Sequence, residues 1–274
     1  MPVLTIKFPP SSLNLGFDAS MAFLITEKLI INEYSQKPMK AIILAAGRST
    51  RMYPITLEKP KCLLELESGK TIIEHQVDVL NKCGIKEIIV IVGYLKEQIQ
   101  DVLKDRVKYR YLKDFAKYNN LHTLYSIKDE LDDDFVILYS DVIFGKNLLK
   151  KCIDSKEDFC LLVHNKEVLK DTARVRIKNG SIIDIGNHIP VEEGDGNFIG
   201  IAKFSKKGAN ILVNEMERMV KDTKHDNSYY IIAIIEISKK MKVAYEYANN
   251  EPWIEIDFLE YYERAVKEIY PLIK

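Results

Sequence analysis

From Met39 onward the chain alternates short apolar runs with segments of helical periodicity, and this alternation restricts the fold more than any other feature. Residues 40–45 (KAIILA) form a continuous apolar run after Lys40, as expected for a strand that is covered on both faces. Residues 71–83 carry apolar side chains at helical spacing up to Gly84, and residues 87–92 (EIIVIV) form a second apolar run. Strand, helix and strand in this order indicate βαβ units. We therefore predict an α/β fold with a mostly parallel, mixed sheet flanked by helices.

The rest of the chain continues this pattern in a more mixed form. Residues 174–185 contain Asn179-Gly180 between two alternating segments, which predicts a hairpin because both residues tolerate positive φ. A final helix is expected after Glu255-Ile256-Asp257, ending near Ile269. The remaining expected helices are residues 94–104, 121–131, 207–220 and 229–239, and the remaining expected strands are residues 107–112, 134–139, 198–204 and 243–247.

Residues 1–38 differ from the rest of the chain, because they show mixed composition and no clear period. We expect them to be a short N-terminal extension of unknown role, placed before a single domain of residues 39–274. Pro9, Pro10 and Asp18 stand where a signal peptide would need a clean apolar stretch. No apolar run of the chain approaches the length of a membrane span.

The charges of the 274-residue chain balance, with 40 Lys and Arg against 40 Asp and Glu. This balance argues against nucleic acid and membrane surfaces as partners, since such binders usually carry a basic excess. The four cysteines show neither a CxxC pair nor zinc-ligand spacing, so they are interpreted as thiols of a reducing compartment. We expect a cytoplasmic protein, and association as a homodimer is left open.

The loop after the first strand carries the main chemical signal. It reads Leu44-Ala45-Ala46-Gly47-Arg48-Ser49-Thr50-Arg51-Met52 and is followed by Lys59-Pro60-Lys61-Cys62-Leu63. Small residues at the carboxyl end of a strand let backbone N–H groups approach a polyphosphate at the switch point of the sheet. Arg51 can fork onto phosphate oxygens, and Lys61 adds a compact positive charge. A lone glycine or a lone basic pair would more simply be a solvated surface turn.

The combined pattern LAAG-x3-R-x7-K-P-K-x-L resembles the signature of the nucleotidyltransferase superfamily, which activates sugar phosphates and small alcohol phosphates. A closer resemblance to the phosphocholine and 2-aminoethylphosphonate cytidylyltransferases rests on residues 119–125, 198–205 and 253–257. The resemblance runs from Met39 to near the C-terminus and implies a Rossmann-like nucleotidyltransferase domain. One departure is Ser49, which stands where the family usually has a second glycine.

Three carboxylates are candidates for holding Mg²⁺. Asp141 follows a buried strand at the same sheet edge as the glycine loop, where one or two carboxylates, phosphate oxygens and water suit this ion. Asp257 is the second candidate. Glu255 lies two residues earlier, so in an extended segment its side chain points to the same face as that of Asp257. In the families that the chain resembles, the matching aspartates bind the metal that bridges nucleotide and acceptor. The alternatives are a turn role for Asp141, a capping box that Asp257 forms with Glu260, and a solvent-facing Glu255.

The sequence gives less information on the nucleotide base and on the acceptor. Asn120 precedes a helix, where its amide could read the edge of a pyrimidine or cap the helix. The resemblance favours cytosine. Tyr125, Tyr229 and Trp253 are candidates for the acceptor wall, although most aromatic side chains belong to ordinary core. Ile231-Ile232 follows a tyrosine pair where phosphocholine enzymes tend to have acidic residues, which is consistent with an acceptor without a cationic head or with helix packing.

These residues together predict a Mg²⁺-dependent cytidylyltransferase. The enzyme would transfer CMP from CTP to a small phosphonate or phosphomonoester of the phosphocholine, 2-aminoethylphosphonate or hydroxyalkylphosphonate class and release pyrophosphate. The acceptor oxygen is already ionised at neutral pH, so positioning and charge neutralisation by Arg51 and Lys61 would suffice. Two alternatives remain open: a sugar-1-phosphate nucleotidylyltransferase that uses UTP or dTTP, and a non-catalytic nucleotide-binding homologue.

Overall fold

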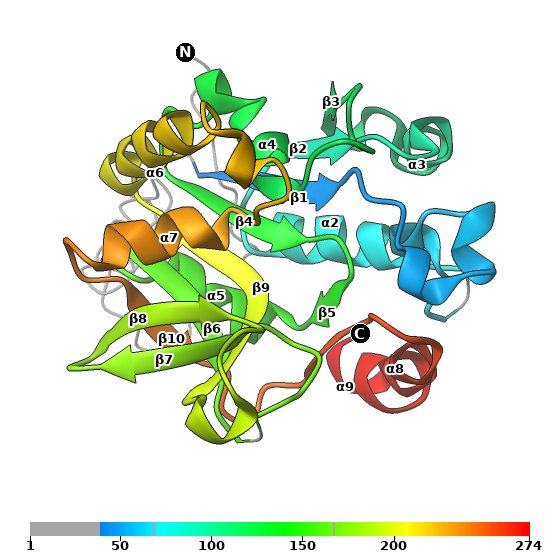
Figure 1. The fold of residues 1–274 in the computed structure, drawn as a ribbon. Helices are drawn as coiled ribbons and strands as arrows, with labels where there is room; N and C mark the ends of the chain where they lie inside the picture. Colours follow the sequence, from blue (N-terminus) through cyan, green and yellow to red (C-terminus); the bar gives the residue numbers. More distant parts are fainter. Residues whose placement is uncertain (1–38, 68, 167) are drawn as a thin grey trace, which may run out of the picture. The chain divides into compact units, whose positions relative to one another are not determined.

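The computed structural model describes residues 39–67, 69–166 and 168–274, which form a mixed sheet with helices on both faces (Figure 1). The strands of this sheet are β1 (Lys40–Ala45), β2 (Glu87–Val92), β3 (Lys108–Tyr111), β4 (Phe135–Tyr139), β6 (Phe159–His164), β7 (Arg174–Lys178), β8 (Ser181–Gly186), β9 (Gly196–Phe204) and β10 (Ala244–Tyr247). Their order is β10-β6-β9-β4-β1-β2-β3, with the β7–β8 hairpin beside β9. β1 runs parallel to both β2 and β4, whereas β9 is antiparallel to β4 and β6. A separate two-stranded sheet pairs β5 (Val142–Phe144) with β11 (Trp253–Glu255).

The helices lie in the connections between these strands. They are α2 (Ile72–Lys82), α3 (Lys96–Leu103), α4 (Asn120–Tyr125), α5 (Lys146–Ile153), α6 (Lys206–Met219), α7 (Ile231–Ser238), α8 (Leu259–Arg264) and α9 (Tyr270–Ile273), with a π-helix at Ala265–Ile269. Single 3₁₀ turns occur at Thr50–Met52, Ile55–Leu57, Lys61–Leu63, Lys104–Arg106, Lys128–Glu130, Val191–Glu193 and Thr223–His225. Among the described helices, none combines the length and apolar character needed to cross a membrane.

The core lies on both faces of the sheet, because successive strand side chains point to opposite sides. Ile42 belongs to a buried cluster that includes Leu124 from α4 and Leu212 from α6. Its neighbour Ile43 belongs to a second cluster, which includes Leu80 from α2. Burial on both sides explains why β1 is apolar at every position after Lys40.

The predicted α/β architecture is confirmed. Gly84 has a φ of 85° just after α2, and Asn179 and Gly180 have φ values of 51° and 71° in the β7–β8 turn. Both signals were therefore located correctly, because these backbone conformations favour glycine and asparagine. The α5–β6 segment had no counterpart in the predicted elements, and the helical C-terminus continues to Ile273, beyond Ile269.

The helix predicted for residues 121–131 is wrong in its second half. α4 ends at Tyr125, where the Ser126 hydroxyl donates to the Thr123 carbonyl oxygen at 2.7 Å. A side-chain hydrogen bond of this kind competes with the helical backbone pattern, and a 3₁₀ turn at Lys128–Glu130 follows. The extension predicted for residues 1–38 lies outside the described residues.

The two sheets bring distant parts of the chain together at one place. β1 and β4 end side by side, so the loop after Ala45 and the turn after Tyr139 leave the same sheet edge. β11 pairs with β5, so that Glu255 lies opposite Val142, and the Ile256 amide donates to the Asp141 carbonyl oxygen at 3.0 Å. The loop of β1, the β4–β5 turn and the end of β11 therefore meet.

Candidate active site

The loop after β1 holds Ser49 in the left-handed region, with φ 53° and ψ 47°. For an L-residue other than glycine this conformation costs about 1–2 kcal/mol, which explains the glycine that the family usually has at this position. The Ser49 carbonyl oxygen accepts hydrogen bonds from the Thr56 hydroxyl at 2.8 Å and from the Met52 amide at 3.1 Å. These contacts keep the loop in its turn without the glycine.

Lys61 is the centre of a buried ion cluster. Its ammonium nitrogen lies 2.6 Å from Asp141 Oδ2 and 3.1 Å from Asp257 Oδ1, and its side chain is 8% exposed. Burial alone would lower the pKa of Lys61, but the two carboxylates outweigh it, and the pKa is raised above its ordinary value. Arg51 approaches the same carboxylate from the solvent side, with Nη2 2.6 Å from Asp257 Oδ1. The two predicted cations and the two predicted aspartates are thus in one place.

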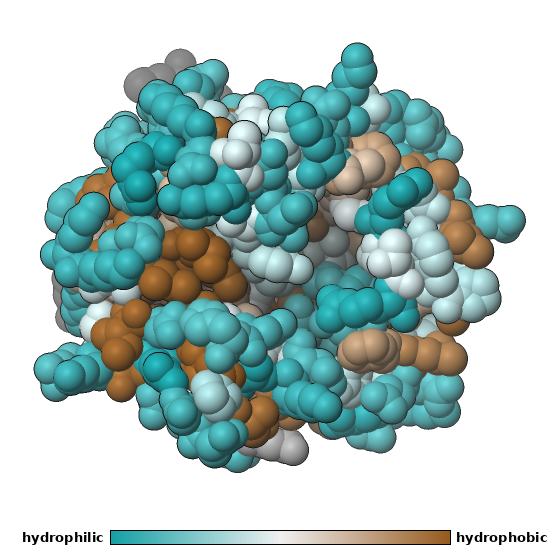
Figure 2. All heavy atoms as spheres, in the orientation of Figure 1, coloured by the Kyte–Doolittle hydropathy of each residue, from teal (hydrophilic) through white to brown (hydrophobic). Residues whose placement is uncertain are grey.

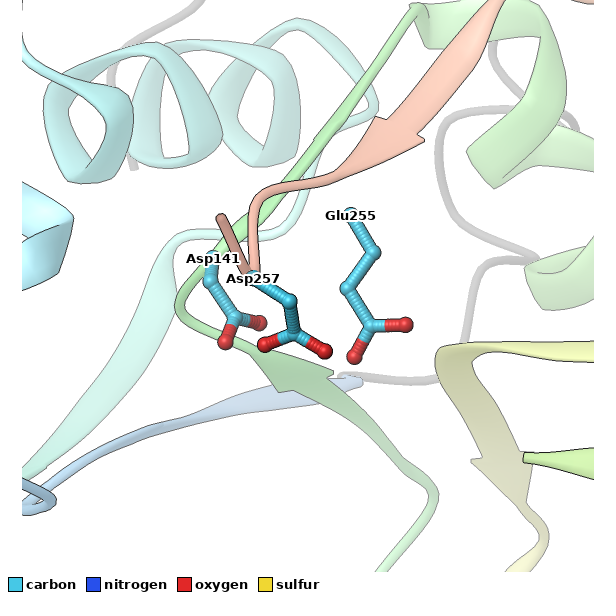
Figure 3. Close-up of side chains that lie close together, drawn as sticks. All are labelled: Asp141, Glu255 and Asp257. Atoms are coloured by element: carbon cyan, nitrogen blue, oxygen red, sulfur yellow. The ribbon is translucent and has the colours of Figure 1, made fainter. Parts of the chain in front are cut away.

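Glu255 completes a group of three carboxyl groups. One oxygen from each of Asp141, Glu255 and Asp257 can be chosen so that all lie within 4.8 Å of one another, and Figure 3 shows the three groups side by side. Burial and the neighbouring aspartates hold the pKa of Glu255 well above its usual range, against the lowering effect of Lys61 and Arg51. Glu255 is half-buried, and its carboxyl group lies beside those of the two aspartates at the cavity.

Asp141 has one oxygen that the ion cluster does not use. Its Oδ1 is buried and has no hydrogen-bond partner among the described residues. A buried carboxylate oxygen without a partner is costly, and three oxygen donors this close suit a hard divalent cation. The residues present therefore fit Mg²⁺.

The capping box considered for Asp257 is also wrong. The N-cap of α8 is Phe258, and no side chain caps the helix. The Asp257 carboxylate is instead engaged by Arg51 and Lys61, which lie about 200 residues earlier in the chain. Phe258 has a different role, since its ring lies 5.7 Å from the Arg51 guanidinium carbon in a cation–π contact.

A cavity opens over this cluster, and its walls come from the loop of β1, the ends of β4 and β11, and the segments before α4 and α7. The lining residues are Leu44, Ala45, Ala46, Gly47, Ser49, Arg51, Met52, Pro60, Lys61, Cys62, Phe115, Tyr118, Asn119, Asn120, Thr123, Tyr139, Ser140, Asp141, Tyr229, Glu255 and Asp257. Most of the predicted loop residues line it, together with both predicted cations and all three carboxylates. In the view of Figure 2 the molecule is hollowed near its centre, beside hydrophobic residues gathered over α7.

Several lining residues were not predicted from the sequence. Phe115 and Tyr118 lie in the connection between β3 and α4 and reach the cavity. A Cβ atom on Gly93 would lie 2.7 Å from both the Ala46 carbonyl oxygen and Phe115, so only glycine fits there. A glycine directly after a buried strand was the available signal, because it marks a close backbone approach.

Asn120 is placed in the cavity wall but is not the helix cap. Asn119 caps α4, because its side chain accepts from the Asn120 amide at 2.8 Å. The Asn120 Oδ1 atom accepts from the Tyr230 amide at 2.7 Å, at the start of α7. Asn120 therefore ties α7, and with it the neighbouring Tyr229, to the cavity.

Four predicted site residues do not line the cavity. Arg48 lies 5.6 Å above the Tyr94 ring, and Thr50 is exposed in the loop. Tyr125 packs against the core with the Lys128 ammonium 5.4 Å from its ring. The Trp253 ring meets the His164 ring edge to face at 5.3 Å. Tyr229 is the one predicted acceptor residue in the cavity wall, and it is 49% exposed.

Comparison with known proteins agrees with this geometry. Residues 41–190 match the family model of the MobA-like NTP transferase domain. The chain is 29% identical to the CTP:phosphoglutamine cytidylyltransferase of Campylobacter jejuni, over 84% of this chain and 100% of that protein. It is 31% identical to the choline-phosphate cytidylyltransferase of Streptococcus pneumoniae, over 84% of this chain and 98% of that protein.

A solved structure of the CTP:phosphocholine cytidylyltransferase from Streptococcus pneumoniae has the same fold. It superposes with a TM-score of 0.74 and 26% identity, covering 84% of this chain and 99% of the other. The predicted resemblance is therefore confirmed over the domain that carries the cavity. The chain belongs to the family of MobA-like NTP transferase domains and is a nucleotidyltransferase.

Proposed function

We propose that this nucleotidyltransferase transfers CMP from CTP to a small phosphomonoester or phosphonate, with Mg²⁺ bound, and releases pyrophosphate. The observation that carries the proposal is the convergence of Lys61 and Arg51 with Asp141 and Asp257 in one cavity beneath the loop of β1. The two relatives described above align along nearly their whole length, and both are cytidylyltransferases of small phosphorylated compounds.

The triphosphate is assigned to the side of the cavity formed by the β1 loop. Ala45, Ala46 and Gly47 present little side-chain bulk there, so backbone N–H groups can approach phosphate oxygens. Among the described residues that line the cavity, Lys61 and Arg51 are the only Lys or Arg residues. Both can turn from their carboxylate partners toward the phosphates and neutralise the charge that develops at the α-phosphorus and on pyrophosphate.

Asp141 and Asp257, with Glu255 beside them, are the residues that would hold Mg²⁺. The bound ion would supply charge neutralisation and alignment for the phosphate oxygens. The acceptor oxygen attacks the α-phosphorus in line and needs no general base, because a phosphate or phosphonate is already ionised at neutral pH. The chain's own contribution is therefore to position two anions against each other and to neutralise them.

The acceptor is assigned to the side of the cavity formed by Tyr139, Tyr229 and Glu255. The Tyr229 ring is half exposed there, as an aromatic wall for a small ligand would be. No further Lys or Arg among the lining residues is available to bind a second phosphate on this side. A small acceptor with one phosphate or phosphonate group suits this wall.

The test is a pyrophosphate-release assay that crosses five nucleoside triphosphates with phosphocholine, 2-aminoethylphosphonate, a hydroxyalkylphosphonate and hexose 1-phosphates, with Mg²⁺ or with chelator. We expect turnover with CTP, a non-sugar acceptor and Mg²⁺, and its loss in Asp141→Asn. Asp154→Asn is the matched control, because Asp154 is exposed and pairs only with Lys150. Turnover of UTP or dTTP with a hexose phosphate would instead support the sugar nucleotidylyltransferase. Nucleotide binding without any turnover would support a non-catalytic homologue.

A further inference from the structure

Gln76 is a polar residue in an apolar place. It lies on α2, is 0% exposed, and is surrounded in sequence by buried residues of the same helix. Its side-chain nitrogen donates to the Tyr139 carbonyl oxygen and to the Val142 carbonyl oxygen, each at 2.8 Å. A buried amide is costly unless it is hydrogen-bonded; the two bonds satisfy its nitrogen, whereas the side-chain oxygen is buried and has no hydrogen-bond partner among the described residues.

The two carbonyl groups that Gln76 binds bracket a single turn. Tyr139 ends β4 and Val142 begins β5, so the residues between them are Ser140 and Asp141. Both protons of one amide therefore fix the two ends of the turn that carries the Asp141 carboxylate. The Asp141 carbonyl oxygen accepts from the Ile256 amide at 3.0 Å, which ties the same turn to the strand before Asp257.

The same helix also anchors the segment that carries Lys61. The amide of Ile72, the first residue of α2, donates to the Leu64 carbonyl oxygen at 3.1 Å, and the Leu64 amide donates to the Lys61 carbonyl oxygen at 3.0 Å. Thr71 and Glu74 fix this end of the helix by a reciprocal capping box. One rigid helix thus holds the ammonium-bearing segment at its start and the carboxylate-bearing turn at Gln76.

We propose that Gln76 is a positioning residue for the active site: its amide holds the Asp141 turn in register with Lys61 and Asp257. The inference rests on the proposed function, because it assigns Asp141 a role with nucleotide and metal. Without the two donors the Tyr139 and Val142 carbonyl groups lose their side-chain partner, and the turn relaxes. A displacement of about 1 Å at a reacting centre can cost on the order of 100-fold in rate, so a small relaxation is enough.

The test compares Gln76→Met with Gln98→Met. Methionine keeps the length and fills the buried space without a donor. Gln98 is the matched control, since its side-chain nitrogen donates to the Glu58 carbonyl oxygen at 2.8 Å and it lies outside the cavity lining. For Gln76→Met we expect a kcat at least about tenfold lower, and a KM for CTP that rises by no more than the factor by which Mg²⁺ tightens CTP binding in wild type. Gln98→Met should match wild type in both.

A binding measurement without turnover separates positioning from packing. Calorimetry of CTP with and without Mg²⁺, in the absence of acceptor, measures the gain in affinity that the metal provides. Gln76→Met should lose most of this gain and keep the metal-free affinity, whereas a residue with a purely structural role would lower the folded fraction and leave the gain intact. Wild-type kcat and a wild-type metal gain in Gln76→Met would overturn the proposal.

A second variant covers the case in which Gln76→Met does not fold. Gln76→Glu keeps the shape and polarity of the side chain but cannot donate two protons to the two carbonyl groups. It should reproduce the loss of kcat and of the metal gain, and wild-type values would again overturn the proposal. If wild-type protein turns over no substrate at all, the proposed function fails. The calorimetric test would then still decide the positioning role. If Mg²⁺ tightens CTP binding to wild type but not to the Gln76 variants, the positioning role is supported. If Mg²⁺ tightens CTP binding equally in the variants, the positioning role is refuted.

Discussion

The Lys61 ammonium nitrogen lies 2.6 Å from the Asp141 carboxylate, and this ion pair links the loop of the first strand to the turn after the fourth. A second contact, 3.1 Å to Asp257, adds the end of β11. Removing one partner from a buried ion pair leaves the other charge uncompensated, so these groups depend on one another. The cluster therefore connects three distant parts of the chain, and we propose that it is also the chemical centre of the cavity.

Lys61→Met should lower kcat by about 100-fold or more, as expected when one group that stabilises transition-state charge is removed. The control is Lys59→Met in the same motif, because the Lys59 side chain is 46% exposed and its ammonium nitrogen pairs with Glu65 at 3.6 Å. Initial rates of pyrophosphate release, normalised to the folded fraction from circular dichroism, measure the effect. Near-wild-type activity in Lys61→Met would remove Lys61 from the mechanism.

Glu255→Gln should stabilise the metal-free protein at neutral pH. The pKa of Glu255 is raised in the folded state, so the folded protein binds its proton more tightly than the unfolded chain does. The penalty for the charged form is absent below the unfolded pKa, grows as the pH rises from the unfolded pKa to the folded pKa, and is constant above the folded pKa. The thermal midpoint of Glu255→Gln should therefore exceed that of wild type by an amount that grows with pH in the same way. Each 1 kcal/mol of unfolding free energy corresponds to about 2–4 °C.

Thermal unfolding in chelator between pH 4 and pH 8 measures this difference. Glu260→Gln serves as the control, because Glu260 is exposed at the start of α8 and should give a difference near zero at every pH. A Glu255→Gln variant that is less stable than wild type at pH 8 would contradict the buried, repelled carboxyl group.

Asn120→Ala should weaken binding of the acceptor more than binding of the nucleotide. The Asn120 side-chain oxygen accepts from the Tyr230 amide and so holds the start of α7, where Tyr229 faces the cavity. Loss of such a buried hydrogen bond costs about 1–3 kcal/mol, so we expect the acceptor KM to rise on the order of tenfold. The ratio of kcat/KM for CTP and UTP should change less than about twofold. A collapse of that ratio with an unchanged acceptor KM would show that Asn120 reads the base instead.

Tyr229→Ala should raise the acceptor KM while the thermal midpoint stays near that of wild type, because half of the side chain is already exposed. Tyr125→Ala provides the contrast. Tyr125 packs against the core outside the cavity lining, so its loss should lower stability and leave the acceptor KM unchanged. Steady-state kinetics together with thermal unfolding distinguish the two. An acceptor KM raised by Tyr125→Ala alone would reverse the assignment.

The fold and the position of the loop after β1 could be predicted because their signals are local. The apolar run of β1, the periodic segment before Gly84 and the Asn179-Gly180 turn each act within a few residues. The end of α4 at Tyr125 was missed because a single hydroxyl bond from Ser126 decided it. Helical periodicity in the sequence does not show that a side-chain hydrogen bond competes with the backbone hydrogen bonds of the helix.

The contacts within the site that could not be predicted are long-range. Asn120 bonds to Tyr230, 110 positions away, and Gln76 bonds to Val142, 66 positions away. Pattern and spacing do not encode partners at such separations. Trp253 and Tyr125 carried the right chemistry for an acceptor wall, but the pairing of β11 with β5 and the packing of α4 direct them elsewhere.

The central claim is that Lys61, Arg51 and the aspartates surround a metal-bound triphosphate. The most direct measurement is an anomalous difference map from crystals grown with CTP and Mn²⁺ as a substitute for Mg²⁺. We predict a manganese peak between Asp141 and Asp257, with the triphosphate along the loop at Gly47 and its oxygens in contact with Lys61. A metal peak away from these carboxylates, or a nucleotide bound outside this cavity, would contradict the account.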